Sequence, residues 1–258
     1  MEKTAKPTIS IIVPVYNEAE NLKPTIDNIL QAVDDLFSDF EILIIDCLDK
    51  DGTDDGTRKI AEEMARKNPR IKSVQNPYVS LGRKFWQGVD LAKFEYVTWF
   101  PGDNETAPET IKKILHFVGK ADIAVSYIAN MEVRPLKRRI ISKTYTFIIN
   151  ILFSLNLRYF NGPPVHKTNL LKSLPSVAKK NEGFSFGAEI LVRLIKAGHN
   201  YVEVPMYLQP RAYGKAKALS VESFKDVIAR ILKLFWEIRI RRFISSILSR
   251  SRNQVGMF

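Results

Sequence analysis

A repeated alternation of short apolar runs and longer helical patterns limits this chain to a small set of folds. The first run begins at Thr8 and is almost continuously apolar and β-branched, which is typical of a strand covered on both faces. After it, Leu22, Ile26 and Val33 recur at helical spacing. Because short connections join the segments, we predict a doubly wound, mostly parallel α/β sheet flanked by helices. The expected strands begin at Thr8 and cover 40–45, 71–75, 96–100, 122–127 and 201–208; the expected helices cover 18–36, 57–67, 81–92, 108–118 and 186–197.

The second half of the chain departs from this pattern. Residues 134–155 begin with basic side chains and continue as an apolar run over 145–155, which is shorter than the roughly 20 residues that a membrane span needs. Residues 221–248 are expected to form one long, basic, amphipathic C-terminal helix. Such a helix either lies in a membrane interface or packs on its own domain. Its apolar stripe consists of Phe224, Val227, Ile228, Ile231, Phe235 and Ile238.

Charge is distributed unevenly along the chain, whose net charge is +11. Residues 1–131 carry 16 basic and 21 acidic side chains, whereas residues 132–258 carry 23 basic and 7 acidic ones. The basic part should therefore face an anionic partner, such as a membrane surface, a nucleic acid or a phosphorylated substrate. It contains no recognition motif for nucleic acid, so we expect a membrane surface and no nucleic acid.

The single cysteine, Cys47, excludes an internal disulfide and fits a reducing compartment. The polar residues 1–7 do not resemble a signal peptide. With the basic second half, these features predict a cytoplasmic protein that lies peripherally at the cytoplasmic face of the membrane.

Acidic side chains follow one of the expected strands at the point where it ends. The run 96–100 stops at Pro101-Gly102, and Asp103 and Glu105 come directly afterwards. Ligands of open α/β sheets bind beyond the carboxyl ends of the strands. Two carboxylates there suit a hard divalent cation that also binds substrate phosphates. The alternative is a polar turn with a helix-capping acid.

Several stretches, in this order, resemble the family-2 glycosyltransferases with the GT-A fold. They are Val13-Pro-Val-Tyr-Asn-Glu18, Ile44-Ile-Asp46 with Asp55-Gly-Thr57, Leu81-Gly82, and Gly102-Asp-Asn-Glu105. Residues 182–189 and 204–215 look like the dolichol-phosphate mannosyltransferase branch. The resemblance covers roughly residues 8–218, and the ordered set is far more specific than any one motif.

This resemblance implies an inverting transfer of a sugar from a nucleotide sugar, UDP- or GDP-linked, to a polyprenyl phosphate such as dolichyl or undecaprenyl phosphate, with Mg²⁺ or Mn²⁺ as cofactor. It divides the chain into a nucleotide-sugar-binding half (1–131), an acceptor-binding half (132–219) and the C-terminal helix (220–258). The resemblance also implies that Asp103 and Glu105 hold the metal, although Pro101 replaces the first acid of the family's Asp-x-Asp element. The residues implied to bind the nucleotide are Pro14, Tyr16, Glu18, Asp46 and Gly82.

The implied acceptor site is basic. A lipid phosphate is already anionic, so it needs arginine and lysine rather than a strong general base. A sugar hydroxyl acceptor, the first alternative, would need a carboxylate base, for which Glu189 is the nearest candidate. The other alternative is a catalytically degenerate relative that only binds nucleotide. The residues expected at the acceptor phosphate are Arg139, Ser142, Arg211 and Lys215, and the expected catalytic set is Asp103, Glu189 and Arg211.

Overall fold

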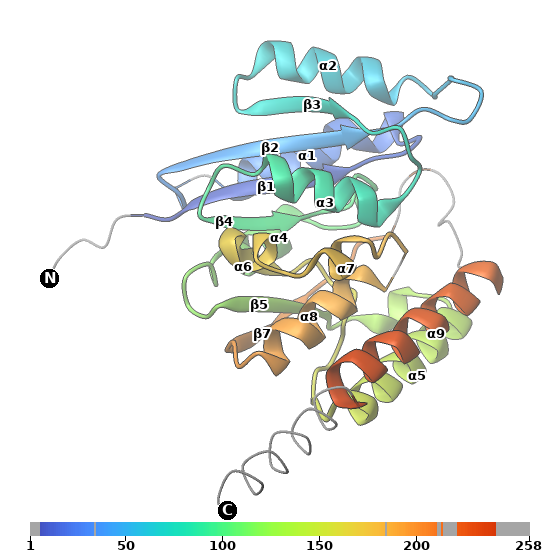
Figure 1. The fold of residues 1–258 in the computed structure, drawn as a ribbon. Coiled ribbons are helices and arrows are strands. Elements are labelled where there is room, and N and C mark those ends of the chain that lie inside the picture. Colours follow the sequence, from blue (N-terminus) through green and yellow to red (C-terminus); the bar gives the residue numbers. More distant parts are fainter. Residues whose placement is uncertain (1–5, 34, 184, 211–212, 214–220, 241–258) are drawn as a thin grey trace, which may run out of the picture.

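A seven-stranded sheet in the order β3-β2-β1-β4-β6-β5-β7 forms the centre of the protein (Figure 1). The computed structural model describes residues 6–33, 35–183, 185–210, 213 and 221–240. Within the sheet, β6 is antiparallel to both of its neighbours and the other pairs are parallel. The predicted doubly wound, mostly parallel sheet is therefore confirmed. Its strands are β1 (Thr8–Pro14), β2 (Asp39–Asp46), β3 (Ile71–Gln75), β4 (Tyr96–Trp99), β5 (Ile123–Ile128), β6 (Val165–Lys167) and β7 (Tyr201–Met206).

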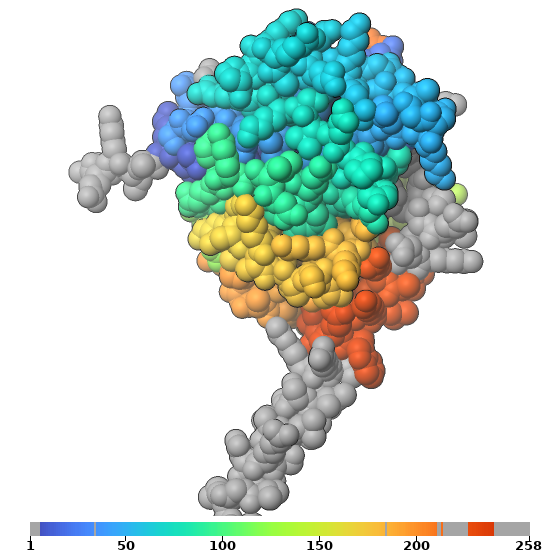
Figure 2. Space-filling model, turned by 45° about the horizontal axis from the view of Figure 1, so that its top comes forward, coloured from blue at the N-terminus to red at the C-terminus, as the bar shows by residue number. Residues whose placement is uncertain are grey.

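Helices cover both faces of the sheet because the side chains of each strand alternate between them. In β1, Ile9 and Ile11 join a core with the helices behind the sheet in Figure 1, α1 and α4, whereas Ile12 joins a core with α3 and α8 in front. Figure 2 shows the front helices as one continuous surface, with α9 at its lower edge. The helices are α1 (Ala19–Val33), α2 (Thr57–Lys67), α3 (Leu81–Leu91), α4 (Pro108–Leu115), η1 (Met131–Val133), α5 (Leu136–Phe153), α6 (Thr168–Lys172), α7 (Ser176–Lys179), α8 (Phe186–Lys196), α9 (Val221–Phe235) and η2 (Trp236–Ile240).

The register of the central strands brings three chain segments to one edge of the sheet. In β1, Pro14 lies beside Ile45 of β2, and Ile12 lies beside Trp99 of β4. Parallel strands end at the same edge, so the segments that follow β1, β2 and β4 meet there. These segments contain the motifs that the sequence singled out.

The second half of the chain completes this sheet. Strands β6 and β7 lie on either side of β5, so residues from 132–219 share the sheet of residues 1–131. The short β6 and the helices α6 and α7 were not expected, because three to five residues are too few to show a period. The domain boundaries remain a prediction.

Helices α5 and α9 lie side by side at the lower right of Figure 1. The rings of Phe153 and Phe235 meet there with centroids 6.2 Å apart. The expected helix 221–248 is observed as α9, which continues as the π-helical turn η2; residues 241–248 lie outside the described part. Within the described ranges, no helix has the length and apolar character needed to cross a membrane.

Candidate active site

A cavity with a volume of about 390 Å³ opens at the edge where β1, β2 and β4 end. Its wall comes from the loop after β1, the start of α3, the turn after β4 and the segment before α8. Three of the five residues expected to bind nucleotide are in this wall, together with Asp103. The lining residues are Pro14, Val15, Tyr16, Glu18, Val79, Ser80, Leu81, Lys84, Pro101, Gly102, Asp103, Glu182 and Gly183.

The loop after β1 is held by the acidic loop after β2. The hydroxyl of Tyr16 donates a hydrogen bond to Asp49, and the amide of Asn17 donates to the same carboxylate at 3.1 Å. The bond to Asp49, with burial, raises the pKa of Tyr16 to about 12. Asn17 has a left-handed backbone with φ of 51°, which asparagine tolerates better than most residues. Sequence reasoning missed Asp49, although its place in a Gly/Asp loop was a signal.

The Asp55-Gly-Thr57 motif has a structural role at the start of α1. The backbone N–H of Glu18 donates to the Thr57 hydroxyl at 2.8 Å, and that of Ala19 donates to the Asp55 carboxylate at 3.0 Å. These bonds satisfy N–H groups that the first turn of a helix leaves without partners. The motif therefore holds the end of the loop between β1 and α1, where Glu18 forms part of the cavity wall.

Asp46 and Gly82 lie next to the cavity rather than in its wall. Asp46 is 1% exposed, and Arg58 donates to its Oδ2 at 2.6 Å. Its Oδ1 is buried and has no hydrogen-bond partner among the described residues. A Cβ on Gly82 would lie 2.7 Å from the backbone of Asn181 and Glu182, so glycine permits α3 to pack against that segment.

The turn after β4 presents the two candidate metal ligands. A Cβ on Gly102 would lie 2.3 Å from Val15, so the turn can approach β1 only with glycine there. The N–H of Glu105 donates to Asp103 at 3.2 Å, and Asn104 has a left-handed φ of 56°. Asp103 is in the cavity wall and Glu105 is partly exposed beside it.

These two carboxylates fit a divalent cation that is shared with a ligand. The described residues contain no group of three or more His, Cys, Asp or Glu side chains that could hold a metal ion alone. Mg²⁺ commonly uses one or two carboxylates together with waters and substrate phosphates. Asp103 and Glu105 match that smaller donor set, and the absence of an acid at Pro101 is consistent with it.

Arg138, in the first turn of α5, lies within electrostatic range of this turn. Arg138 interacts electrostatically with Glu105 and Asp103, while burial and the charge of Arg134 lower the pKa of Arg138. Arg134 donates to the Tyr159 hydroxyl at 3.0 Å. Sequence reasoning selected Arg139 and did not name Arg138 or Arg134, because a motif does not show which charges on neighbouring turns lie near one another.

Arg139, Ser142, Arg211 and Lys215 were expected at the acceptor phosphate. Arg139 and Ser142 lie on α5, both partly exposed. The Nε of Arg139 is buried without a hydrogen-bond partner among the described residues. Arg211 and Lys215 lie outside the described part of the chain, so their placement stays a prediction.

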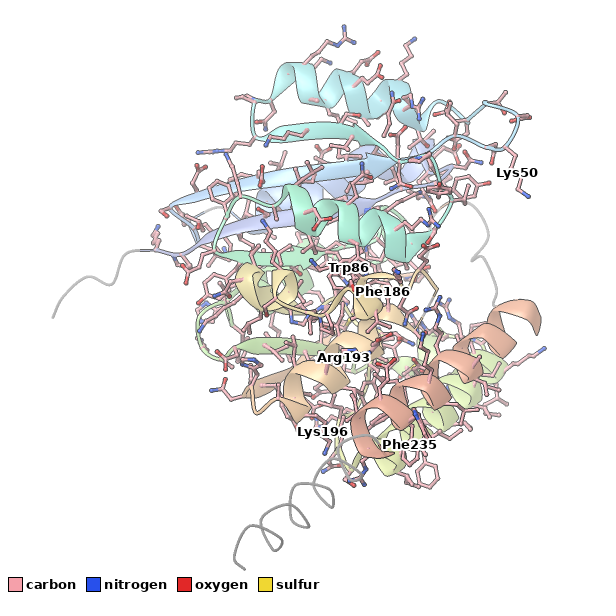
Figure 3. The ribbon with its side chains drawn as sticks, viewed as in Figure 1. Lys50, Trp86, Phe186, Arg193, Lys196 and Phe235 are labelled. Atoms are coloured by element: carbon pink, nitrogen blue, oxygen red, sulfur yellow. The ribbon has the colours of Figure 1, made fainter. Side chains whose placement is uncertain are left out.

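Glu189 lies away from the 390 Å³ cavity, in a small separate one between α5, α8 and α9. Arg193 donates to its Oε1 at 2.8 Å and Asn181 donates to its Oε2 at 2.8 Å. Arg193 also pairs with Glu237 of η2 at 2.6 Å, and Figure 3 shows Arg193 on α8. Both oxygens of Glu189 are thus engaged, one by Arg193 of the same helix and one by Asn181 of the segment before it.

An aromatic cluster supports the cavity from beneath. Phe85 and Trp86 of α3 contact each other with ring centroids 5.3 Å apart, and Phe186 of α8 lies 4.9 Å from Phe85 and 5.9 Å from Trp99. Figure 3 shows Trp86 and Phe186 in the middle of the molecule and Lys50 at the tip of the loop after β2, away from this cluster. This packing fixes α3 against β4 and α8.

Comparison with known proteins identifies the family. The family model described as glycosyl transferase family 2 matches residues 10–168. This chain is a family 2 glycosyltransferase. The match includes the loop after β1, the acidic loop, the start of α3 and the Asp103 turn, so the family expected from the ordered motifs is confirmed.

Relatives and solved structures agree with this family. A polyprenol monophosphomannose synthase from Mycolicibacterium smegmatis is 27% identical to this glycosyltransferase over 251 residues, covering 92% of this chain and 91% of that protein. An undecaprenyl-phosphate mannosyltransferase from Micrococcus luteus is 24% identical over 215 residues, covering 80% and 85%. Glucosyl-3-phosphoglycerate synthase from Mycobacterium tuberculosis, solved with Mn²⁺, UDP-glucose and phosphoglyceric acid, has a TM-score of 0.67 at 18% identity and covers 89% of this chain and 80% of that one. The expected GT-A fold is thereby confirmed.

Proposed function

We propose that this glycosyltransferase moves a sugar, with inversion at the anomeric carbon, from a nucleotide sugar to a polyprenyl phosphate at a membrane surface. The observation that carries the proposal is the 390 Å³ cavity, whose wall joins the Tyr16 loop to the Asp103 turn. Two relatives that match most of this chain are named as polyprenol-phosphate or undecaprenyl-phosphate mannose enzymes, which supports the acceptor class.

The donor occupies the cavity. Pro14, Tyr16 and Glu18 border its nucleoside, and Asp103 with Glu105 would hold Mg²⁺ or Mn²⁺ against the diphosphate. Such an ion neutralises the charge that develops on the departing nucleoside diphosphate. Carboxylate and phosphate oxygens are suitable ligands for both metals.

The acceptor approaches from the arginine-rich start of α5. Arg138 interacts with the acids of the turn, so a lipid phosphate that binds beside it lies close to the leaving diphosphate. Guanidinium groups bind phosphate oxygens in bidentate geometry. The phosphate oxygen is already anionic and attacks without a general base, which agrees with the engagement of both Glu189 oxygens by Arg193 and Asn181.

Exposed apolar side chains on α5, α9 and the turn η2 that continues α9 support the membrane surface as partner. These helices lie side by side, and their apolar residues alternate with basic ones. A basic amphipathic helix binds an anionic bilayer with its apolar face. The location that we propose is therefore peripheral, at the cytoplasmic face of the membrane. The exposed apolar residues are Leu136, Ile140, Ile141, Phe147, Ile148, Ile151, Ile228, Leu232 and Trp236.

A transfer assay tests the proposal. Nucleotide sugars with uridine or guanosine are incubated with the enzyme, Mn²⁺ and polyprenyl phosphate, and the lipid-linked sugar is extracted and quantified. The wild type should form it, and Asp103→Asn should lower kcat at least roughly a hundredfold because one charge opposite the diphosphate is lost. Asp27→Asn, at a surface ion pair on α1, is the matched control. A product found only on saccharide acceptors would contradict the proposal.

A further inference from the structure

Gln209 joins the segment after β7 to the turn that carries the two candidate metal ligands. Its backbone N–H donates to the carbonyl of Glu105 at 2.9 Å, and its side-chain Nε2 donates to the carbonyl of Asn104 at 2.8 Å. Gln209 thus holds consecutive carbonyls of a turn that begins more than 100 residues earlier, since Asn104 and Gln209 are 105 positions apart. Sequence reasoning gave Gln209 no role, because nothing in the sequence shows that these segments meet.

Asn104 lies between the two candidate ligands and has a conformation that needs support. Its φ of 56° is in the left-handed region, where residues other than glycine persist only when their surroundings hold them. On α1, the Thr25 hydroxyl accepts from the Asn104 N–H at 3.0 Å, and Asn28 donates to the Asn104 Oδ1 at 2.9 Å. Thr25, Asn28 and Gln209 are not among the described residues that line the cavity, so they support the turn from outside its wall.

The segment that presents Gln209 is itself fixed. Leu208 forms an antiparallel bridge with Thr106, just after the turn. Asn130 donates to the Leu208 carbonyl at 2.8 Å and accepts from its N–H at 2.9 Å. Gln209 follows directly and is partly buried. A hydrogen-bond donor on a backbone held in this way can keep the turn in one position.

The proposed metal site depends strongly on the shape of this turn. Because Pro101 stands in place of an acid, the site relies on Asp103 and Glu105. The N–H of Glu105 donates to the Asp103 Oδ1 at 3.2 Å, so a rotation of the turn would displace both carboxylates together. Residues that hold metal ligands in place without touching the ion commonly contribute roughly tenfold to a hundredfold to metal affinity.

We propose that Gln209 is a positioning residue for the divalent cation: its hydrogen bonds keep the turn in the conformation in which one ion binds both Asp103 and Glu105. The inference rests on the proposed function and concerns a residue that touches neither the ion nor the donor. Without the Nε2 donor, the Asn104 carbonyl loses this partner and the turn relaxes. The ion should then bind more weakly even though both carboxylates are still present.

A titration of Mn²⁺ tests this role without turnover. The ion is added to the enzyme in the presence of UDP or GDP, and free Mn²⁺ is quantified by electron paramagnetic resonance. Gln209→Met keeps the length of the side chain and removes the donor, so the affinity for Mn²⁺ should fall roughly tenfold to a hundredfold. The matched control is Gln87→Met on α3, which removes a bond from Nε2 to the carbonyl of Gln75 at 3.1 Å and should leave the affinity for Mn²⁺ unchanged.

The outcomes separate this inference from the proposed function. If Gln209→Met binds Mn²⁺ as tightly as the wild type, or if Gln87→Met loses as much affinity, Gln209 has only a structural role, while Mn²⁺ binding by the wild type still supports the proposed function. If the wild type binds no Mn²⁺ with either nucleotide, the proposed donor site fails as well. Melting temperatures without ligand report on folding. Gln209→Asn, whose amide is one methylene shorter, should also lose affinity and decides the question should Gln209→Met not fold.

Discussion

At the scale of single residues, the ion pairs differ in burial, and a pair beside the cavity is buried while others lie on the surface. Asp46 is buried beside the cavity and paired with Arg58, whereas Arg70 and Asp39 lie 3.6 Å apart with both side chains about half exposed. Water screens the second pair and leaves it a small effect. The first pair fixes a buried carboxylate next to the cavity.

Removing the partner of Asp46 should destabilise the protein. Arg58→Met leaves a buried carboxylate without its counter-ion, so the free energy of unfolding should fall by about 3–5 kcal/mol. Arg70→Met, the matched control, should change it by less than about 1 kcal/mol. Urea denaturation followed by circular dichroism measures both. If both substitutions lower the free energy of unfolding equally, the burial of Asp46 does not strengthen its pairing with Arg58.

Stability should also fall in acid because of Glu41. Burial alone raises the pKa of this carboxyl, but bonds from Lys72, Ser10 and the Lys93 N–H outweigh it and leave the pKa below its ordinary value of 4.5. A depressed pKa contributes stability above the unfolded value and loses it as pH falls through the folded value.

Glu41→Gln tests this dependence. The variant should be less stable than the wild type at pH 7, and the difference should shrink as the pH falls below about 4.5, where the unfolded chain begins to bind the proton. Urea midpoints at pH 7, 5 and 4 measure it. If the stability difference between the wild type and Glu41→Gln stays constant across this pH range, Glu41 does not contribute to the loss of stability in acid.

At the scale of elements, α8 is tied to the end of α9 by Glu189, Arg193 and Glu237. Sequence reasoning placed Glu189 in the catalytic set because it lies in a family-like motif. The tie gives the acid at that position a structural role, since removing a charged partner from the largely buried Arg193 is costly. Whether Glu189 also acts as a base is open to a direct measurement.

Glu189→Gln distinguishes the two roles. Transfer to a lipid phosphate needs no general base, so kcat should stay within a few-fold of the wild type while the melting temperature falls, because Arg193 loses one counter-charge. Activity on the lipid acceptor and thermal unfolding are measured on the same preparation. Loss of activity without loss of stability would show that Glu189 takes part in the transfer reaction.

At the scale of the whole molecule, we propose different partners for the cavity and for the exposed apolar helices. The cavity lies at the edge where β1, β2 and β4 end, and α5 and α9 pack as a pair against α8 (Figure 1). Phe147 of α5 is 64% exposed, and Trp236 of η2, which continues α9, is 60% exposed. Water is a poor environment for such side chains, so an apolar partner stabilises them.

Vesicle binding measures that partner. The wild type should float with vesicles of phosphatidylcholine and phosphatidylglycerol, and less so in high salt, since the attraction between basic side chains and anionic lipid is screened. Phe147→Gln together with Trp236→Gln should reduce the floated fraction severalfold because apolar burial is lost. Leu91→Gln, at an exposed leucine of α3, should not. Equal flotation of all three proteins would exclude α5 and α9 from membrane binding.

The fold was predictable because its signals are local. The parallel core strands are continuous apolar runs, and the helices between them repeat every three to four residues, so each element shows its type within its own segment. The antiparallel β6 was not predictable, because its three residues form a strand only between β4 and β5. Helix ends were wrong by a few residues, as in α4, which ends at Leu115 rather than 118.

By itself, the sequence determined the doubly wound sheet, the acids after β4 and membership of the family, since each depends on residues close together in the chain. Only the tertiary structure decided that Arg138 lies within electrostatic range of Asp103 and Glu105, that Glu189 is engaged by Arg193, and that Lys84 is buried. The reason is physical: burial and charge pairing depend on which distant segments meet, and those contacts exist only once the sheet has formed.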